Sequence, residues 1–392
     1  MVYSRTKNIF IIFIYLISSI NIIFAPFLRQ INIIDEMLVL FLAIYSIRYI
    51  SIYFNREVLT VFIILIGYLI YSSIIAINTS KGIILDFILF LKPFISFFVA
   101  FLIPISLKAP QKKILRIIFL CLGLYCWTIL PYINQIYTNT ARYYPACISC
   151  SIGYLFFSKG EKKDWLIALL LMIPGLAAIR AKFYTEFVFF IYIGFFIKGK
   201  IHFNIKWVVI FSFLILFSIY LNQEKFYAYF VSGYEDGAAR SYFYAKTLDV
   251  LSHYFPLGSG FGSFGTEGAA RFYSPLYHSL GFDYIWGLRE IDYATDHDFL
   301  HDTFYPALAQ FGIIGILLFI WFWGRRLKDA ILLKDHHYYK LFIFIFFVIA
   351  IQNIAANAFT SADGVQYMLL MGMILSKNKL EYGKNKYNSS SI

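Results

Sequence analysis

Long runs of apolar residues, separated by short polar stretches, make up most of the chain. Many of these runs contain roughly 17–20 residues, and a helix of that length crosses the ~30 Å hydrocarbon layer of a bilayer. We therefore predict an all-α polytopic membrane protein, a single integral membrane domain over residues 1–392, with about twelve transmembrane helices. The predicted spans are Ile9–Ala25, Met37–Phe54, Leu59–Ile77, Ile83–Ile105, Ile114–Pro131, Tyr144–Phe157, Trp165–Ala178, Phe183–Ile197, Trp207–Leu221, Phe304–Trp323, Tyr339–Ala356 and Val365–Leu375.

One long polar interval, residues 222–303, separates the ninth predicted span from the tenth. Residues 241–253 predict a helix there, because Pro256 and Gly258 mark its end. The interval also contains most of the side chains that can carry chemistry outside the apolar runs. We expect this large loop to carry part of the active site. Its candidate residues are Arg240, Arg271, Arg289, His301 and Asp302.

Composition and charge placement agree with a membrane protein. Hydrophobic residues make up 60% of the chain and charged residues only 14%, which excludes an ordinary soluble domain. The formal net charge is +12, and the lysines and arginines lie mainly in alternate short loops. This distribution indicates membrane topology and not a nucleic-acid-binding surface. The bias predicts that both termini are cytoplasmic and that residues 222–303 lie outside. The opposite short loops hold only Arg29, Lys81, Arg142, Arg180 and Lys182.

The cysteines and glycines predict no cofactor. Cys147-Ile-Ser-Cys150 has the spacing of a redox or metal site but lacks a second pair, so we interpret these cysteines as small packing residues. The glycines of residues 258–265 are not followed by the Gly-Lys-Ser/Thr of a phosphate-binding loop. Aromatic residues reach 21%, and such rings either anchor helices at the membrane interface or stack on sugar faces.

Several outward cations oppose the topology signal and so point to a ligand. Arg142 lies at the outer end of the sixth span, and Arg180 lies in a very short connection. The planar guanidinium fork of arginine suits phosphate oxygens. Lys182 either joins this group or pairs with Glu186 one turn along. Snorkelling toward lipid head groups is the alternative for each cation.

His301 is the best candidate general base, because a neutral imidazole accepts a proton near neutral pH. Asp302 either orients it or caps the following helix. An ordinary surface histidine is the alternative. His297 and His301 also stand one turn apart, so a metal-dependent hydrolase with Asp292 or Asp296 as third ligand is a second hypothesis. A transporter that uses Asp86 and Lys92 of the fourth span is a third.

The order of these motifs resembles the O-antigen polymerase and O-antigen ligase superfamily of bacterial envelope glycosyltransferases. The resemblance covers roughly residues 180–319, and the rest of the chain agrees in span count and topology. The usual His-Asn is His301-Asp302 here, and Gln310-Phe311 replaces a Glu that often precedes the first glycine. The matching elements are Arg180 between two short spans, Arg240 followed by Pro256-Leu257-Gly258-Ser259-Gly260-Phe261-Gly262-Ser263-Phe264, and His301-Asp302 with Gly312-Ile313-Ile314-Gly315 entering a helix.

The resemblance implies a metal-independent, inverting glycosyltransferase at the periplasmic face of the bacterial inner membrane. A polymerase would transfer an undecaprenyl-pyrophosphate-linked glycan chain onto the next lipid-linked repeat unit, and a ligase would transfer it to lipid A-core. The isoleucine and aromatic content favours the polymerase. The implied partners are the lipid-linked oligosaccharide, membrane lipid and a chain-length regulator protein. Arg180 and Arg240 would hold the pyrophosphate and His301 would be the base, with Arg142, Lys182, Asp302, Arg271 and Arg289 as further substrate-binding residues.

Overall fold

The computed structural model describes residues 9–28, 34–49, 55–103, 105, 107–136, 142–200, 220, 223, 227, 238–295 and 299–389, the last segment with side chains to Lys377. Its regular elements in these ranges are helices. The first group comprises α1 (Ile9–Ile23), α2 (Ala25–Leu28), α3 (Ile34–Ile47), α4 (Arg56–Ile75), α5 (Ser80–Leu102), α6 (Ala109–Ile129), η2 (Leu130–Tyr132), α7 (Ile133–Ile136), α8 (Tyr143–Phe157), α9 (Lys162–Met172), η4 (Ile173–Ala178), α10 (Ala181–Ile191) and η5 (Tyr192–Phe196).

The second group begins inside the polar interval and continues to the last helix. It comprises α13 (Ala239–His253), α14 (Glu267–Arg271), α15 (Pro275–Ser279), η6 (Phe282–Tyr284), α16 (Glu290–Ala294), α17 (Phe304–Ala307), η7 (Leu308–Phe311), α18 (Gly312–Ile331), α19 (His336–Gln352) and α20 (Ala362–Ser389). The all-α prediction is thus confirmed for the described residues. Trp207–Leu221, the ninth predicted span, lies almost wholly outside them.

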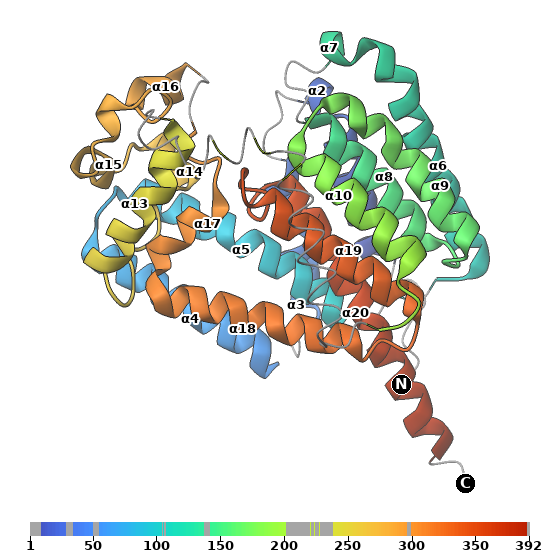
Figure 1. Ribbon diagram of the computed structural model, residues 1–392. Coiled ribbons are helices and arrows are strands. Elements are labelled where there is room, and N and C mark those ends of the chain that lie inside the picture. Colours follow the sequence, from blue (N-terminus) through green and yellow to red (C-terminus); the bar gives the residue numbers. More distant parts are fainter. Residues whose placement is uncertain are drawn as a thin grey trace.

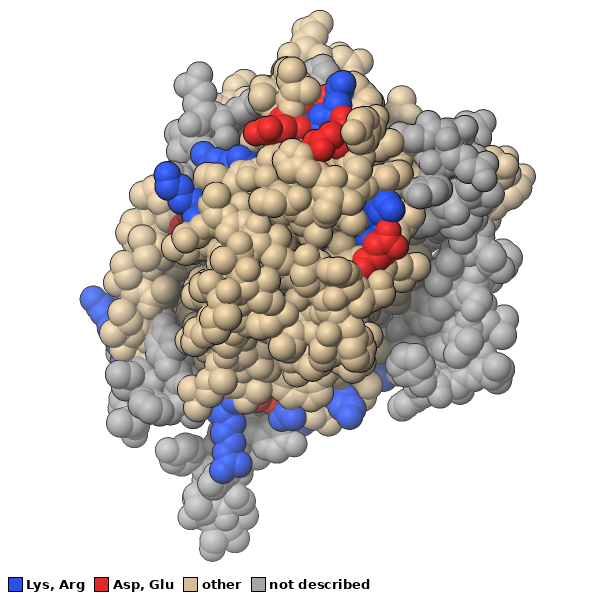
Figure 2. Space-filling model, turned by 90° about the vertical axis from the view of Figure 1, so that its left-hand side faces the viewer, with Lys and Arg blue, Asp and Glu red and all other residues tan. Residues whose placement is uncertain are grey.

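Four helical stretches are long and apolar enough to cross a membrane by length and composition: Arg56–Ile75, Ser80–Leu102, Ala109–Ile136 and Phe304–Ile331. Two shorter apolar helices, Ile9–Ile23 and His336–Gln352, accompany them. Exposed isoleucines such as Ile63 and Ile70 on α4 give that helix an apolar outer surface. Figure 2 shows a broad uncharged area with charged groups above it and basic residues along its lower edge. These features support a membrane protein, and the count of twelve spans stays a prediction.

Small residues let the central helices pack closely. α5 and α20 run along each other in the middle of the molecule (Figure 1). A side chain at Gly372 of α20 would place its Cβ only 2.4 Å from the carbonyl oxygen of Phe97 on α5. Gly153 of α8 likewise makes room for the ring of Phe119 on α6. Close contact through small residues is typical of helix packing in membranes, because van der Waals packing there replaces the hydrophobic effect.

The helices α13–α17 form a lobe beside the ends of α4 and α5, at the upper left of Figure 1. This lobe has its own apolar core, separate from the core of the helix bundle. Phe243 of α13 stacks on Phe264 with ring centroids 4.5 Å apart, and Tyr277 stacks on Phe282 at 4.9 Å. The large loop is therefore a folded unit in its described part, residues 238–295 and 299–303.

The glycine run attaches this lobe to the transmembrane helices. Asp86 of α5 is fully buried, and its carboxylate accepts hydrogen bonds from the backbone N–H of Gly262 (2.7 Å), the backbone N–H of Gly268 (2.8 Å) and the Thr266 hydroxyl. Gly258, with φ of +81°, lies so close to α18 that a Cβ would meet the Gly312 nitrogen at 2.2 Å. The glycines are needed here for tight turns and close backbone approach.

Asp86 and Lys92, the two residues of the transporter hypothesis, have separate partners in the structure. The Lys92 ammonium contacts Asp35 at 2.6 Å and Glu36 at 2.7 Å, both on α3. Buried charges need a partner, and each of the two finds one from another element. The pairing therefore joins α3 to α5, while Asp86 joins α5 to the lobe.

Replacing Asp86 with alanine is expected to destabilise the fold by about 3 kcal/mol or more, because each buried donor left without an acceptor costs about 1–3 kcal/mol. Thermal unfolding of the detergent-purified protein would measure the loss. Asp86→Asn keeps one carbonyl acceptor and should lose less. Asp249→Ala is the control, since its side chain is 56% exposed. An unchanged unfolding midpoint for Asp86→Ala would contradict the attachment role.

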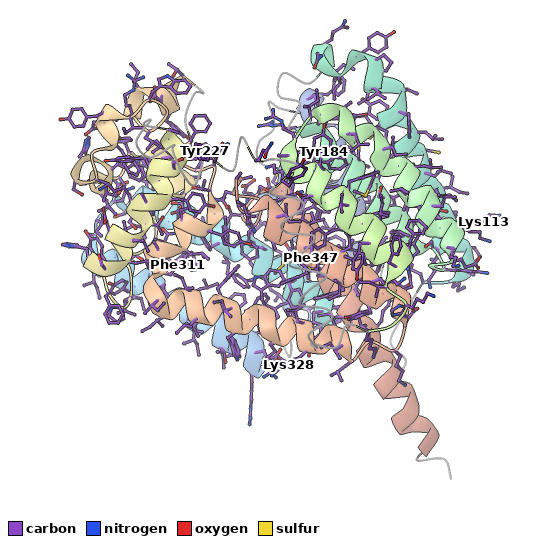
Figure 3. All side chains as sticks on the ribbon, in the orientation of Figure 1. Lys113, Tyr184, Tyr227, Phe311, Lys328 and Phe347 are labelled. Atoms are coloured by element: carbon purple, nitrogen blue, oxygen red, sulfur yellow. The ribbon has the colours of Figure 1, made fainter. Side chains whose placement is uncertain are left out.

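The connections that carry most lysines and arginines meet at one end of the bundle. Glu57, at the start of α4, accepts a hydrogen bond from Arg326 near the end of α18 at 2.8 Å. The Lys200 ammonium donates to the carbonyl of Ile331 at 2.5 Å. In Figure 3, Lys113 is labelled at the right and Lys328 at the bottom, whereas Phe311 is labelled at the left. Basic loops and the α13–α17 lobe thus lie at opposite ends.

Candidate functional site

Arg240 and Asp302 form an ion pair at the inner edge of the lobe. Arg240 lies in the first turn of α13, and Asp302 follows the turn that leads to α17. The Arg240 Nη2 donates to Asp302 Oδ2 at 2.6 Å, and their side chains are 20% and 37% exposed. The guanidinium also lies 4.9 Å from the centroid of the Phe299 ring. The pair is therefore held in a partly buried position that solvent still reaches.

His301 lies beside a carboxylate from another part of the lobe. Its Nε2 is 3.7 Å from Oε2 of Glu267, the first residue of α14. The other Glu267 oxygen accepts a hydrogen bond of 2.8 Å from the Tyr293 hydroxyl, and the Tyr293 ring lies edge-on to His301 at 6.2 Å. Asp302 binds Arg240, and its orienting role toward His301 stays a prediction. A carboxylate next to an imidazole stabilises the protonated ring and so supports a base.

Glu267 is placed by the attachment of the lobe to α5. The Thr266 hydroxyl caps α14 by accepting from the backbone N–H of Ala269 at 3.4 Å, and the same hydroxyl donates to Asp86. The Gly268 N–H also binds Asp86. The residues on both sides of Glu267 are therefore anchored to one buried carboxylate, which limits the movement of the Glu267 backbone.

The other predicted cations converge on the same region. Lys182 of α10 interacts electrostatically with Asp302 and Arg240 as well as with Glu186. Asp363, at the start of α20, interacts with both Lys182 and Arg142. Three basic residues from three parts of the chain, Arg142, Lys182 and Arg240, thus share acidic neighbours. Arg180 joins the group through Tyr144 of α8, with which it interacts.

Arg271 and Arg289 take other positions in the lobe. Arg271 is exposed at the end of α14. The guanidinium of Arg289 binds Asp292 with contacts of 2.7 and 2.9 Å, and these hydrogen bonds hold the pKa of the Asp292 carboxyl below its usual value. The Arg289 guanidinium therefore binds a carboxylate of the lobe itself. Both carboxylate oxygens of Asp292 already accept hydrogen bonds, so Asp292 is poorly placed to bind a metal ion.

Two of the residues that the hydrolase hypothesis needs, His297 and Asp296, lie outside the described residues. That hypothesis stays a prediction.

The sequence did not predict three residues of this region, Glu267, Tyr293 and Asp363. Thr266 before Glu267 is a recognisable helix start, because threonine is a favoured N-cap residue. The sequence gives no sign, however, that Glu267 lies next to His301. Asp363 stands two residues before the last predicted span, and the sequence pattern gave it no role.

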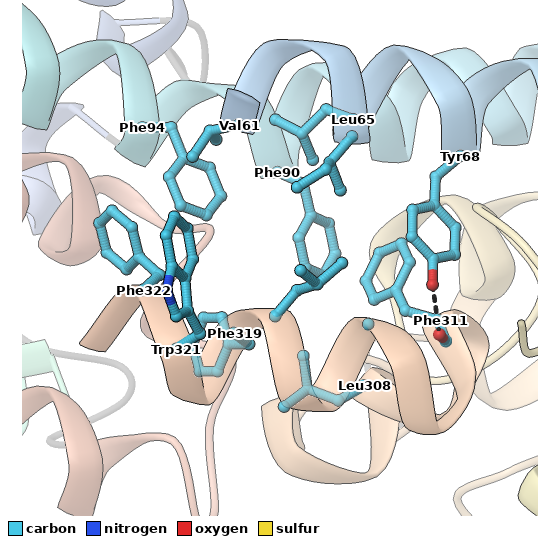
Figure 4. Close-up of a pocket in the computed structure, with 13 residues that line it drawn as sticks. Val61, Leu65, Tyr68, Phe90, Phe94, Leu308, Phe311, Phe319, Trp321 and Phe322 are labelled. Atoms are coloured by element: carbon cyan, nitrogen blue, oxygen red, sulfur yellow. Dashed lines mark hydrogen bonds between the residues drawn. The ribbon is translucent and has the colours of Figure 1, made fainter. Parts of the chain in front are cut away.

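A separate apolar pocket of about 70 Å³ lies between α4, α5 and α18 (Figure 4). Phenylalanines such as Phe90, Phe94 and Phe322 line it, and the Tyr68 hydroxyl at its edge donates to the Phe311 carbonyl at 2.8 Å. Its lining carries no charged group. The pocket therefore contributes apolar surface, while the polar chemistry belongs to the His301 and Arg240 region.

Comparisons with protein-family models, with curated proteins and with solved structures find no match to this chain. A function is therefore inferred from the residues themselves, from their arrangement and from the motif resemblance.

Proposed function

We propose that this protein is an integral membrane glycosyltransferase of the O-antigen polymerase type. It would transfer a glycan chain from undecaprenyl pyrophosphate onto the next lipid-linked repeat unit. The observation that carries the proposal is the juxtaposition of a carboxylate-supported base, His301 with Glu267, and a group of cations around Arg240. A displacement at an anomeric carbon needs both, one to activate the acceptor and one to stabilise the leaving pyrophosphate.

The reaction follows from these positions as a single direct displacement. His301 takes the proton of the acceptor hydroxyl while that oxygen forms a bond to the anomeric carbon of the donor glycan. The bond between this carbon and the pyrophosphate oxygen breaks, and the electron pair leaves with the pyrophosphate. Arg240 and Arg180 stabilise the departing charge, with Lys182 and Arg142 close by. Glu267 stabilises the imidazolium that results, and the anomeric configuration inverts.

Asp302 Oδ2 accepts a hydrogen bond from the Arg240 guanidinium at 2.6 Å. A pyrophosphate would therefore compete with this carboxylate or share the cation with it. Charge-assisted bidentate binding to phosphate oxygens favours the exchange, because an Arg fork matches their geometry. Asp302 thus acts as the resting partner of the arginine, which keeps a partly buried cation paired between substrates.

The site would face the periplasm, with both termini and the basic connections in the cytoplasm of the bacterial inner membrane. The separation of basic loops from the lobe, seen in the ion pairs of Glu57 and the contact of Lys200, supports this orientation. About twelve spans complete the proposed topology. Membrane lipid surrounds the helices, and a chain-length regulator protein is the proposed protein partner.

The banding of lipopolysaccharide from a deletion strain tests the proposal. A core that carries one repeat unit and no ladder is the result expected for loss of a polymerase. A core without any repeat would assign the protein as an O-antigen ligase that uses lipid A-core as acceptor. An unchanged ladder would remove both functions.

Cysteine labelling of intact cells should reach position 240 but not position 328. The physical reason is the positive-inside rule, which keeps the basic connections in the cytoplasm. Single cysteines would be introduced at Arg240, Lys162 and Lys328 after replacement of the four native cysteines. A membrane-impermeant maleimide measures the exposure, and permeabilised cells serve as the control. Labelling at position 162 without labelling at position 240 would reverse the topology and refute the mechanism.

A further inference from the structure

Three large aromatic side chains of the lobe, Phe255, Tyr284 and Trp286, are strongly exposed. Tyr284 is 89% exposed and Trp286 is 59% exposed, whereas Phe243 and Phe282 are fully buried. The indole combines a large apolar face with a polar N–H, so an exposed tryptophan can bind a ligand that has both apolar and polar groups. Trp286 packs against Phe299, which in turn lies beside the Arg240 guanidinium.

Two hydrogen bonds hold the backbone of Gly287, the residue that follows Trp286. The Gly287 N–H donates to the buried Asp292 carboxylate at 2.7 Å, and the Gly287 carbonyl accepts from the Phe299 N–H at 2.8 Å. Gly287 has φ of +86°, a conformation that favours glycine. A rigidly held aromatic side chain loses little conformational entropy when a ligand binds. The indole is therefore presented to solvent by an ordered segment.

Ring contacts connect Trp286 to the Arg240 pair. The Trp286 and Phe299 centroids are 6.0 Å apart with the ring planes at 66°. Phe299 in turn lies 4.9 Å from the Arg240 guanidinium, which binds Asp302. The absence of a side chain at Gly287 permits this packing, since a Cβ there would lie 2.6 Å from the Phe299 ring. Trp286 thus extends the site outward along a continuous line of contacts.

We propose that Trp286 is the stacking platform for a pyranose ring of the glycan, one or more sugars away from the reacting carbon. The apolar C–H face of a pyranose matches the face of an indole, while its hydroxyl groups stay in contact with water and with polar neighbours. The inference rests on the proposed function, because it takes the ligand of the His301 and Arg240 region to be a glycan. Anchoring of Trp286 in lipid head groups is the competing explanation and gives a different experimental outcome.

The test uses full-length protein in lipid nanodiscs and two readouts. The first is the KM and kcat of polymer formation for the lipid-linked acceptor. The second is the tryptophan fluorescence change on titration with oligosaccharide that mild acid releases from the lipid-linked intermediates of the producing cell. The variants are Trp286→Ala, Trp286→Leu and Trp286→Phe. Trp321→Leu is the matched control, because Trp321 is a 42% exposed tryptophan of α18 outside the lobe.

Trp286→Ala and Trp286→Leu should raise the KM at least about tenfold, as for a central aromatic contact, while kcat changes less than about twofold. Trp286→Phe retains an aromatic face and should raise the KM less than about threefold. Leucine keeps apolar area without a flat face, so a normal KM in Trp286→Leu would overturn the stacking role. So would quenching of the Trp286 contribution by brominated lipid chains combined with no response to oligosaccharide.

The two readouts separate this inference from the proposed function. If wild-type protein forms no polymer but its oligosaccharide-induced fluorescence change disappears in Trp286→Leu, the platform stands and the proposed reaction is wrong. If wild-type protein forms polymer and every Trp286 variant keeps its KM, the reaction stands and the platform is wrong. The Trp321→Leu control should match wild type in both readouts.

Discussion

Replacing His301 with alanine is expected to abolish glycosyl transfer while leaving binding of the lipid-linked donor nearly unchanged. A general base acts in the chemical step and typically contributes about 10²–10⁴-fold to the rate. The donor pyrophosphate would still meet Arg240 and the neighbouring cations. Polymer formation at matched protein level measures the first effect, and binding of labelled donor to the purified protein measures the second.

Glu267→Gln sharpens this experiment. Glutamine keeps the shape of the side chain and can still accept the Tyr293 hydroxyl, but it removes the charge 3.7 Å from His301. The rate should fall by less than in His301→Ala, because the base remains and only its stabilising carboxylate is lost. Asp302→Asn tests the competing assignment, in which Asp302 orients the base. A larger rate loss in Asp302→Asn than in Glu267→Gln, or normal polymer from His301→Ala, would contradict the proposed site.

Arg180→Lys and Arg240→Lys are each expected to slow transfer by about a hundred- to a thousandfold, although the charge is kept. Lysine cannot bind two phosphate oxygens with a planar fork. The loss of one such contact at a developing anion costs about 3–4 kcal/mol of barrier. In Arg240→Lys the contact to Asp302 also loses its guanidinium geometry, so donor binding should weaken alongside the rate.

Arg116→Lys provides the matched control for these substitutions. Arg116 lies on α6, and its guanidinium is 4.0 Å from Asp164 at the start of α9, at the end of the bundle with the basic connections. This variant should keep normal polymer. Equal losses in all three Arg→Lys variants would indicate a general folding defect. Normal polymer from both Arg180→Lys and Arg240→Lys would show that pyrophosphate is held by other groups.

The hydrophobic pattern alone determined the helical class and most helix positions of this protein. Runs such as Tyr144–Phe157 and Ile83–Ile105 coincide closely with α8 and α5, because apolar residues in such numbers can satisfy their backbone only as helices. The helix opened by Arg240 was also predicted from its proline and glycine end signals, and the structure places it at Ala239–His253. These features depend on local residues, so the order of residues is sufficient to predict them.

Only the tertiary structure decided which side chains meet. His301 lies next to Glu267 of α14, and the adjacent Asp302 binds Arg240 on α13. Asp86 binds the glycine run across the helix–lobe boundary, so it cannot pair with Lys92 on its own helix. Contacts of this kind depend on how separate elements pack together. The hydrophobic period of each segment contains no information about that packing, and so the ion pairs of the site could not be predicted from sequence.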